Sequence, residues 1–308
     1  MSTFLSTSSA AVSPVTGAVT APDAALPGLP AGVVRRAAVL GSPVAHSLSP
    51  VLHNAAYTAL GLTSWSYTRV ECDEGGLAEF VSGRGPEWVG LSLTMPLKRV
   101  ALEVATEVSA GARAIGAANT LLLAPGRLVA ENTDAPGMAD ALRAAGLVMA
   151  ATPVVLGAGG TAQAALAALA GSAAGSPPLV SGAVTVLVRS PHRAGELRAT
   201  AERLGLRIDL QSFEQAPARL AAADLIVSTL PKGVADPFAH AVLRPAALVF
   251  DVIYDPWPTA LATAAAATGC RVVSGLDLLL HQAAHQVRLM TGHAAPIDAM
   301  RAALALAR

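Results

Sequence analysis

The sequence predicts an α/β protein with two domains, and three observations lead to this prediction. Its 308 residues are enough for two domains of ordinary size. Short apolar strands alternate with helical segments along most of the chain, which is typical of a mostly parallel sheet covered by helices. A glycine-rich turn at residues 157–162 joins one such strand directly to a helix.

The first series of elements begins near residue 35 with the strand RRAAVLG, which ends in a turn rich in Gly, Ser and Pro. Pro50 then opens a helix that closes at Gly61. SWSYTRVEC alternates as a strand, a helix follows through Phe80, and WVGLSLTM is the next strand. Pro96 marks the first turn of a predicted helix that carries Lys98.

A hairpin-like pair of strands, ANTLLL and RLVAENTD, follows around the turn at residues 125–126. A helix then runs from Ala135 to about Gly146. The hydroxyl and carboxylate groups of Asn132-Thr133-Asp134 suit the N-terminal cap of this helix, with Thr133 or Asp134 as the capping residue.

The second series starts with a strand at residues 153–156 and a helix over residues 160–170. After a long connection, VTVLV is a strand and RAGELRATAERLG is an amphipathic helix. DLIVSTL, ALVFDVIY and CRVVSG are further buried strands. A long helix from about Leu276 to Met290 and a short one after Pro296 complete the chain.

The composition argues against several classes of partner. A formal net charge of +0 provides no basic field for nucleic acid or for anionic lipid. Hydrophobic residues make up 53% of the chain, but no apolar run reaches the roughly 18–20 residues of a membrane span. We therefore expect no nucleic-acid partner and no membrane partner.

Cysteine and histidine usage predicts neither disulfides nor a metal site. Cys72 and Cys270 lie far apart, as reduced structural thiols of a cytoplasmic protein would. His281 and His285 are four residues apart in an apolar helix without an evident third ligand, so we expect no metal. Residues 1–34, rich in Ser, Thr, Ala and Pro, are expected to be a disordered leader or an over-long start of the reading frame.

The glycine-rich turn predicts a dinucleotide site. Glycines at such a turn let the backbone approach a pyrophosphate at a helix N-terminus, where free N–H groups favour an anion. The alternative is a tight strand-to-helix turn with no ligand. The predicted pyrophosphate-binding residues are Gly157, Ala158, Gly159, Gly160 and Thr161.

The end of the following strand favours NADP over NAD. A carboxylate there would bind the ribose 2′-hydroxyl of NAD, but VTVLV leads instead into Arg189, Ser190 and Arg193. Guanidinium groups suit a 2′-phosphate. The alternative is a solvated pair of surface arginines.

Polar side chains at predicted strand ends of the first series predict a site for a small polyhydroxylated molecule, because ligands bind at that edge of an α/β sheet. Lys98 is one of only two lysines among 21 basic residues, and a lysine, unlike an arginine, can exchange a proton near neutral pH. Helix capping and surface solvation are the alternatives for each residue. The candidates are Ser47, Ser49, Thr94, Lys98, Asn119, Thr120 and Asp134.

Seven motifs occur in the order, and at about the spacing, of one enzyme family: GSPVAHSLSP, LTMPLK, GAANT, ENTDAPG, LGAGGTA, DVIYDPWPT and GLDLLLHQAAHQ. From residue 36 to about 300 the chain resembles the shikimate dehydrogenase family. The resemblance implies a cytoplasmic NADP-dependent oxidoreductase that interconverts 3-dehydroshikimate and shikimate in chorismate and aromatic amino acid biosynthesis. It also implies a small-molecule substrate and, for the assembly, a monomer or homodimer.

The resemblance further implies the division of the chain and its residue roles. Residues 35–134 with 276–308 would form a substrate-binding catalytic domain, and residues 135–275 a Rossmann-like NADP-binding domain, with the C-terminal helix packing back on the first. Lys98 and Asp134 would be the catalytic pair. The substrate would contact Ser47, Ser49, Thr94, Lys98, Asn119, Asp134, Tyr254 and Gln282. NADP would contact the glycine turn, Arg189, Ser190, Arg193, Val252 and Gly275.

Several positions depart from the family's common motifs. Ser92 replaces the usual asparagine, and its side chain is too short to be expected to contact the substrate directly, except through water. Met95 and Leu97 replace other apolar residues. Val188 replaces an asparagine before the arginines, and Lys232 has no expected role. The alternatives in function are a quinate/shikimate dehydrogenase paralogue and a non-catalytic cofactor-binding protein. The presence of both Lys98 and Asp134 argues against the second.

Overall fold

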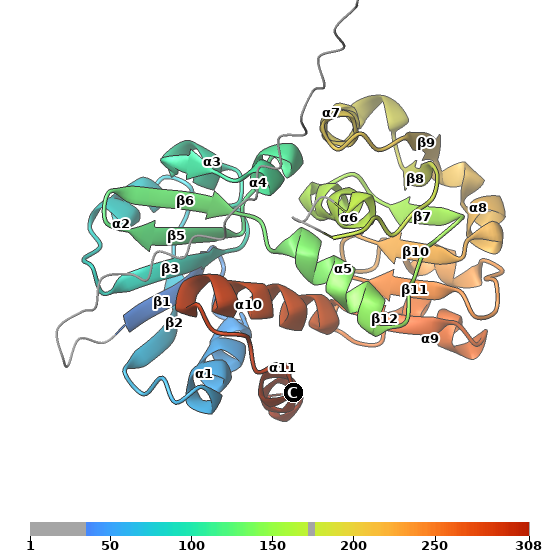
Figure 1. The fold of residues 1–308 in the computed structure, drawn as a ribbon. Helices are drawn as coiled ribbons and strands as arrows, with labels where there is room; N and C mark the ends of the chain where they lie inside the picture. Colours follow the sequence, from blue (N-terminus) through green and yellow to red (C-terminus); the bar gives the residue numbers. More distant parts are fainter. Residues whose placement is uncertain (1–34, 172–175, 308) are drawn as a thin grey trace, which may run out of the picture.

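The computed structural model describes residues 35–171 and 176–307, so the predicted leader lies outside the described residues. Two six-stranded sheets lie side by side, and the long helices α5 (Asp134–Ala144) and α10 (Gly275–Thr291) lie between them (Figure 1). The predicted α/β class with two sheet-containing units is confirmed.

The first sheet is mixed, with strand order β2-β1-β3-β5-β6-β4. Strand β1 pairs in parallel with β2 and β3, whereas β5 runs antiparallel to both β3 and β6. The strands are β1 (Arg35–Gly41), β2 (Trp65–Glu71), β3 (Trp88–Leu93), β4 (Glu107–Val108), β5 (Thr120–Ala124) and β6 (Arg127–Glu131). Its helices are α1 (Ser49–Ala59), α2 (Leu77–Ser82), α3 (Val100–Val104) and α4 (Ala110–Ile115).

The second sheet is entirely parallel, with strand order β12-β11-β10-β7-β8-β9. The chain leaves β7 toward β8 on one side and returns to β10 on the other, which is the reversal at which dinucleotides bind in Rossmann folds. Its strands are β7 (Pro153–Leu156), β8 (Val184–Val188), β9 (Ile208–Ser212), β10 (Leu225–Ser228), β11 (Leu248–Asp251) and β12 (Arg271–Ser274). Its helices are α6 (Gly160–Ala170), α7 (Gly195–Arg203), α8 (Ala216–Ala222) and α9 (Ala260–Ala267), with short 3₁₀ turns η1 (Pro191–Arg193), η2 (Phe213–Gln215) and η3 (Asp236–His240).

Both sheets are held by apolar layers that the sequence pattern anticipates. The central strands β7, β10 and β11 of the second sheet are buried on both faces, as continuous apolar runs require, and Phe250 is fully buried. The alanine-rich helix α6 is buried over most of its length because small side chains let it pack close to the sheet. The high content of hydrophobic residues in this chain is therefore explained by packing in the protein interior. Among the described residues, no helix combines the length and the apolar character needed to cross a bilayer.

Several elements differ from the sequence prediction. Strand β9 and the short elements β4 and α4 were not predicted. The apolar residues of β9 and β4 are only partly buried, and α4 is a helix of 6 residues. The first sheet is less parallel than predicted, because the hairpin of β5 and β6 inserts two antiparallel pairings.

Lys98 lies in a turn before α3 rather than in that helix, which begins at Val100. The reason is a hydrogen-bond partner from outside the helix: the Lys98 carbonyl accepts from Ala118 N at 2.8 Å. A helical Lys98 would instead need its carbonyl for Leu102 N, which donates to Arg99 O.

Helices α5 and α10 cross in close contact. A Cβ atom on Gly137 of α5 would lie 2.6 Å from Gln282 N and 2.7 Å from Gln282 Cα of α10. Nearby, His285 of α10 hydrogen-bonds Asp140 of α5 at 2.7 Å, and this bond is the main cause that lowers the pKa of Asp140. The last helix, α11 (Ile297–Leu306), packs on α1, where Leu52 and Met300 share an apolar cluster with α10.

We expect Gly137→Ala to lower the free energy of unfolding by about 1–3 kcal/mol, because the added methyl group must push the α10 backbone away. Gly111→Ala in α4 is the matched control, since its Cβ would meet nothing within 4 Å. The control should be neutral or stabilising by up to about 1 kcal/mol. Urea unfolding of the two variants measures both values, and equal stabilities would contradict the close crossing.

Candidate active site

A cavity of about 270 Å³ lies between one edge of the first sheet and helix α10. All eight residues predicted to bind substrate line it. Val252 and Gly275, which directly follow strands β11 and β12 of the second sheet, line it as well. The eight are Ser47, Ser49, Thr94, Lys98, Asn119, Asp134, Tyr254 and Gln282. Residues from opposite ends of the chain therefore meet around one small space.

Among the described residues that line this cavity, Lys98 and Asp134 form the only charged pair. Lys98 Nζ donates to Asp134 Oδ2 at 2.6 Å, and the exposed fractions of the two side chains are 34% and 13%. The ammonium group is therefore held at the cavity wall by a largely buried carboxylate. Its remaining N–H donors are free to reach a bound molecule.

Asn132 places the carboxylate of Asp134. Its Oδ1 accepts from Asp134 N at 3.0 Å and from Ala135 N at 3.2 Å, and its Nδ2 donates to Ala117 O at 2.9 Å. Thr133 is the N-cap residue of α5, one of the two predicted for that position, but its side chain makes no capping hydrogen bond; the Asn132 side chain accepts from the N–H groups of Asp134 and Ala135 instead. The carboxylate of Asp134 is consequently left for Lys98.

Asn119 joins this pair from the start of β5. Its Oδ1 accepts from Thr133 N at 2.8 Å, which directs Nδ2 toward Asp134 Oδ1 at 2.9 Å. Nδ2 also lies 3.3 Å from Gln282 Oε1 on α10. Asn119 was predicted to follow a strand, but it lies directly before β5. Because β5 runs antiparallel to β3, the start of β5 lies at the same edge of the sheet as the end of β3.

Ser47 and Ser49 form the opposite wall, where their hydroxyl oxygens lie 3.2 Å apart. Arg69 Nε donates to the Ser47 carbonyl at 2.8 Å and holds this loop to β2. Ser49 is the first residue of α1, and its N–H donates to Ser47 Oγ at 3.3 Å. Burial raises the pKa of Tyr254, whose hydroxyl therefore stays protonated as a donor at neutral pH.

Two buried polar residues of the cavity wall had no predicted role. Ser92 was noted only as a departure from the family's wording, and Gln286 was not predicted at all. The signal for Gln286 is its spacing: it follows Gln282 by four residues, which places both amides on one face of α10. Both residues are buried, with exposed fractions of 4% for Ser92 and 1% for Gln286.

A second cavity of about 360 Å³ adjoins the first and shares Thr94, Lys98 and Asp134 with it. On its far side lie Gly160 and Thr161, in the first turn of α6. In the part of the chain that the structure describes, no side chain caps α6, and a Cβ on Gly159 would meet nothing within 4 Å, so there is open space beside this turn. Gly157 has φ +110° and lies against Thr229, where only glycine fits. This turn fits an anion such as a pyrophosphate.

Arg189, Ser190 and Arg193 lie together just beyond the end of β8, outside both cavities. Both arginines are exposed, and among the described residues neither side chain forms an ion pair. The nearby carboxylate of Glu196 is taken by Arg99 at 2.7 Å. These cations are therefore available to a phosphate group.

Comparisons with known proteins agree with this arrangement. Residues 39–121 match the family model for the shikimate dehydrogenase substrate binding domain, and residues 275–305 match that for the shikimate 5'-dehydrogenase C-terminal domain. The shikimate dehydrogenase (NADP(+)) of Desulfitobacterium hafniense is 35% identical over 280 residues, which are 88% of this chain and 98% of that protein. The chain belongs to the shikimate dehydrogenase family.

Solved structures of family members share the fold. The shikimate dehydrogenase of Mycobacterium tuberculosis superposes with a TM-score of 0.80 at 46% identity, over 88% of this chain and 99% of that one. The Thermus thermophilus enzyme, solved in complex with NADP(H) and shikimate, superposes with a TM-score of 0.75 at 36% identity, over 89% of this chain and 100% of that one. The predicted family and its two-domain fold are thereby confirmed.

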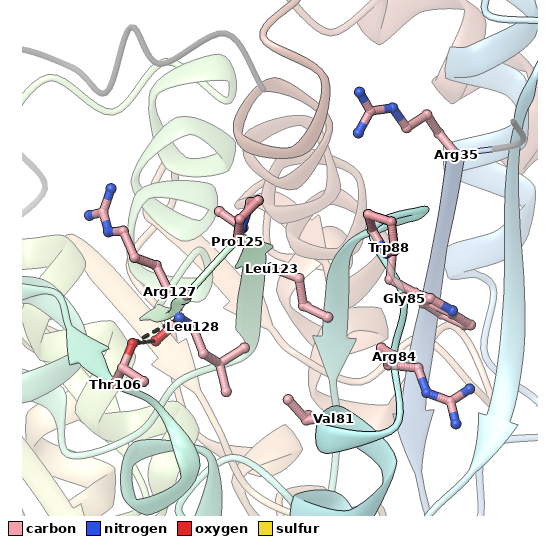
Figure 2. A pocket seen from close by; sticks show the side chains of 13 residues that line it. Arg35, Val81, Arg84, Gly85, Trp88, Thr106, Leu123, Pro125, Arg127 and Leu128 are labelled. Atoms are coloured by element: carbon pink, nitrogen blue, oxygen red, sulfur yellow. Dashed lines mark hydrogen bonds between the residues drawn. The ribbon is translucent and has the colours of Figure 1, made fainter. Parts of the chain in front are cut away.

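A larger cavity of about 590 Å³ lies at the other end of the first sheet, beside Trp88 and the β5–β6 hairpin (Figure 2). Its walls are mainly apolar, and two of the arginines around it are engaged elsewhere. Arg84 stacks 4.2 Å from the centroid of the Phe80 ring, and Arg127 forms two hydrogen bonds with Glu107. The described residues that line this larger cavity include no pair like Lys98 and Asp134. The candidate active site is therefore identified by its charged pair and not by its volume.

We expect Asn132→Ala to lower both stability and activity. The lost cap costs about 1–2 kcal/mol of unfolding free energy, and the freed N-terminus of α5 lets Asp134 move away from Lys98. Ser109→Ala is the control, because Ser109 caps α4 by accepting from Ala112 N at 3.1 Å. That control should lose stability alone. If both variants keep full turnover at matched folded fraction, Asn132 does not position the site.

Proposed function

We propose that this protein is an NADP-dependent shikimate dehydrogenase that reversibly reduces 3-dehydroshikimate to shikimate in chorismate and aromatic amino acid biosynthesis. The observation that carries the proposal is the Lys98–Asp134 pair, which lies in the wall of a small polar cavity next to the glycine turn. The D. hafniense and T. thermophilus relatives support the choice of substrate and cofactor.

The proposed substrate contacts follow the chemistry of the cavity walls. The hydroxyls of Ser47, Ser49 and Tyr254 would donate to the substrate carboxylate. Thr94, Asn119 and Gln282 on the other side would contact ring hydroxyls. No arginine is needed for the carboxylate, because three hydroxyl donors can satisfy its oxygens while leaving the product free to dissociate.

Lys98 and Asp134 would perform the acid–base part of the reaction. Bound NADPH supplies the hydride that reduces the ketone carbon of the substrate. As the carbonyl oxygen gains negative charge, the Lys98 ammonium donates a hydrogen bond and then a proton to it. Asp134 stabilises the ammonium before transfer and keeps Nζ directed at the cavity. In the reverse direction neutral Lys98 accepts the hydroxyl proton.

The residues proposed to hold NADP fit the group. Gly157 to Thr161 would bind the pyrophosphate at the α6 N-terminus, and Arg189, Ser190 and Arg193 would bind the 2′-phosphate. Val252 and Gly275 line the substrate cavity from the second sheet, as neighbours of the nicotinamide would. A Cβ on Gly275 would lie 1.9 Å from Val252 O, so these two segments are in direct backbone contact.

We also propose which parts of the chain form the substrate-binding and the NADP-binding domain. Residues 35–134 with 276–308 would form the substrate-binding domain and residues 135–275 the NADP-binding domain. The supporting observations are that α5 begins at Asp134 and that α10 packs against β3 and β5 of the first sheet. A cytoplasmic monomer or homodimer is the proposed form.

The experiment that tests the proposal is reduced-nicotinamide formation by the purified protein, with shikimate or quinate against NADP or NAD. We expect turnover mainly with shikimate and NADP. Turnover with quinate would indicate the quinate/shikimate paralogue instead. Cofactor binding without turnover on either substrate would indicate a non-catalytic protein.

We expect Lys98→Arg to lower kcat by about 10²–10⁴-fold with little change in substrate binding, because a guanidinium keeps the charge but does not release a proton. Asp134→Asn should also lower kcat, since a neutral amide cannot stabilise the ammonium. Steady-state kinetics with a direct measurement of shikimate binding separate the two effects. A near-native kcat for either variant would remove that residue from the acid–base pair.

We expect the double change Arg189→Ala with Arg193→Ala to lower kcat/KM for NADP by about 10²-fold or more while leaving that for NAD nearly unchanged, because each lost charge-assisted bond costs about 1.5–3 kcal/mol. Arg198→Ala on the exposed side of α7 is the control and should preserve the preference. An unchanged NADP/NAD ratio in the double variant would mean that these arginines only face solvent.

A further inference from the structure

Gln286 of α10 is at the centre of a buried hydrogen-bond network behind the cavity wall. Its carboxamide contacts residues from four other segments: α1, β3, the residue before β5, and β5 itself. No role for this side chain follows from the sequence resemblance. The network is buried, so each of its donors and acceptors needs a partner within it.

The backbone determines which way the Gln286 amide points. One end of the amide lies 3.2 Å from Asn119 O, and a carbonyl oxygen can only accept. That end must therefore be Nε2, which also donates to Thr120 Oγ1 at 2.9 Å. The opposite end, Oε1, consequently faces α1 and β3.

Gln286 Oε1 meets two donors on that side. His53 Nε2 lies 3.2 Å away, and burial lowers the pKa of His53 to about 3, so the ring is neutral and its single proton resides on Nε2. Ser92 Oγ lies 2.7 Å away and donates its one proton to the same oxygen. Because the Gln286 amide cannot rotate, its Oε1 fixes His53 Nε2 and Ser92 Oγ as hydrogen-bond donors.

Ser92 then has no proton left for any other group. Its second neighbour, Tyr67 OH at 2.5 Å, must donate to it. Burial raises the pKa of Tyr67, which keeps that hydroxyl protonated. The lone pair of Ser92 Oγ that remains is the only polar function it can offer to the cavity that it lines.

We propose that Gln286 is a positioning residue that fixes Ser92 as a hydrogen-bond acceptor, so that this wall selects a substrate hydroxyl able to donate. The inference rests on the proposed function and deepens it. An asparagine at position 92, usual in the family that the motifs resemble, would carry an N–H₂ donor as well as an acceptor. Ser92 with Gln286 and Tyr67 offers an acceptor alone.

The test uses substrate analogues whose hydrogen-bond polarity differs at one position. Shikimate has two ring hydroxyls that are not oxidised, and each is replaced in turn by fluorine, which is close in size but cannot donate. We expect the native enzyme to use one of the two fluoro analogues about 10–100-fold less well than shikimate in kcat/KM. Ser92→Ala should abolish this difference. If the native enzyme uses both analogues as well as shikimate, Ser92 does not select a donor.

Two variants of Gln286 separate positioning from a general structural effect. Gln286→Met has a similar length but accepts no strong hydrogen bond, so Ser92 regains a free proton and the discrimination should fall below about threefold. Gln286→Glu keeps an oxygen toward Ser92 and should keep the discrimination even where kcat falls. Thermal unfolding of each variant confirms that it is folded.

The outcomes are distinct. Undiminished discrimination in Gln286→Met, or its loss in Gln286→Glu, would overturn the inference; the Glu variant alone decides if the Met variant does not fold. Absence of shikimate turnover in the native protein would overturn the proposed function, and this inference with it. Turnover without discrimination between the analogues would overturn the inference alone.

Discussion

The close crossing of α5 and α10 is the constraint on which the site depends. Each helix begins at a residue of the cavity, Asp134 for α5 and Gly275 for α10, and the two meet where Gly137 leaves no room for a side chain. The crossing brings two sheet edges together. One edge is formed by the residues that follow β1, β3 and β6 of the first sheet, and the other by the residues that follow β7, β11 and β12 of the second. A molecule between them touches both sheets, which is the geometry that transfer from a cofactor on one to a substrate on the other requires.

Within that space, one ion pair is surrounded by neutral polar groups whose directions are fixed by the backbone. Thr133 N orients the Asn119 amide, and Asn119 O orients that of Gln286. Each amide then directs the next group, Asp134 in one case and Ser92 in the other. Such preorganised dipoles stabilise charge that develops during a reaction without having to turn when it appears. Lysine suits the centre of this arrangement better than arginine, because an ammonium can give up a proton and a guanidinium does not.

The sequence alone was sufficient for those features that depend on local pattern or on spacing. Strand–helix alternation identified the parallel second sheet, and the glycine turn identified the open N-terminus of α6. All eight predicted substrate residues line one cavity, although their individual roles stay predictions. The mixed first sheet and the position of Lys98 outside α3 were not predictable in this way, nor was it predictable which side chain of Asn132-Thr133-Asp134 bonds the first N–H groups of α5. Each depends on a partner distant along the chain or on the direction of a side chain, and neither leaves a periodic signal.

Ser92 shows how such a distant partner changes the meaning of a local substitution. Considered by itself, a serine in place of asparagine shortens the side chain and loses one polar group. In the fold, the hydroxyl lies between Gln286 and Tyr67, which together use its proton and one of its lone pairs. What a residue offers to a ligand is therefore decided by the hydrogen bonds behind it. In this cavity those bonds lead back to a backbone carbonyl, which can only accept a hydrogen bond.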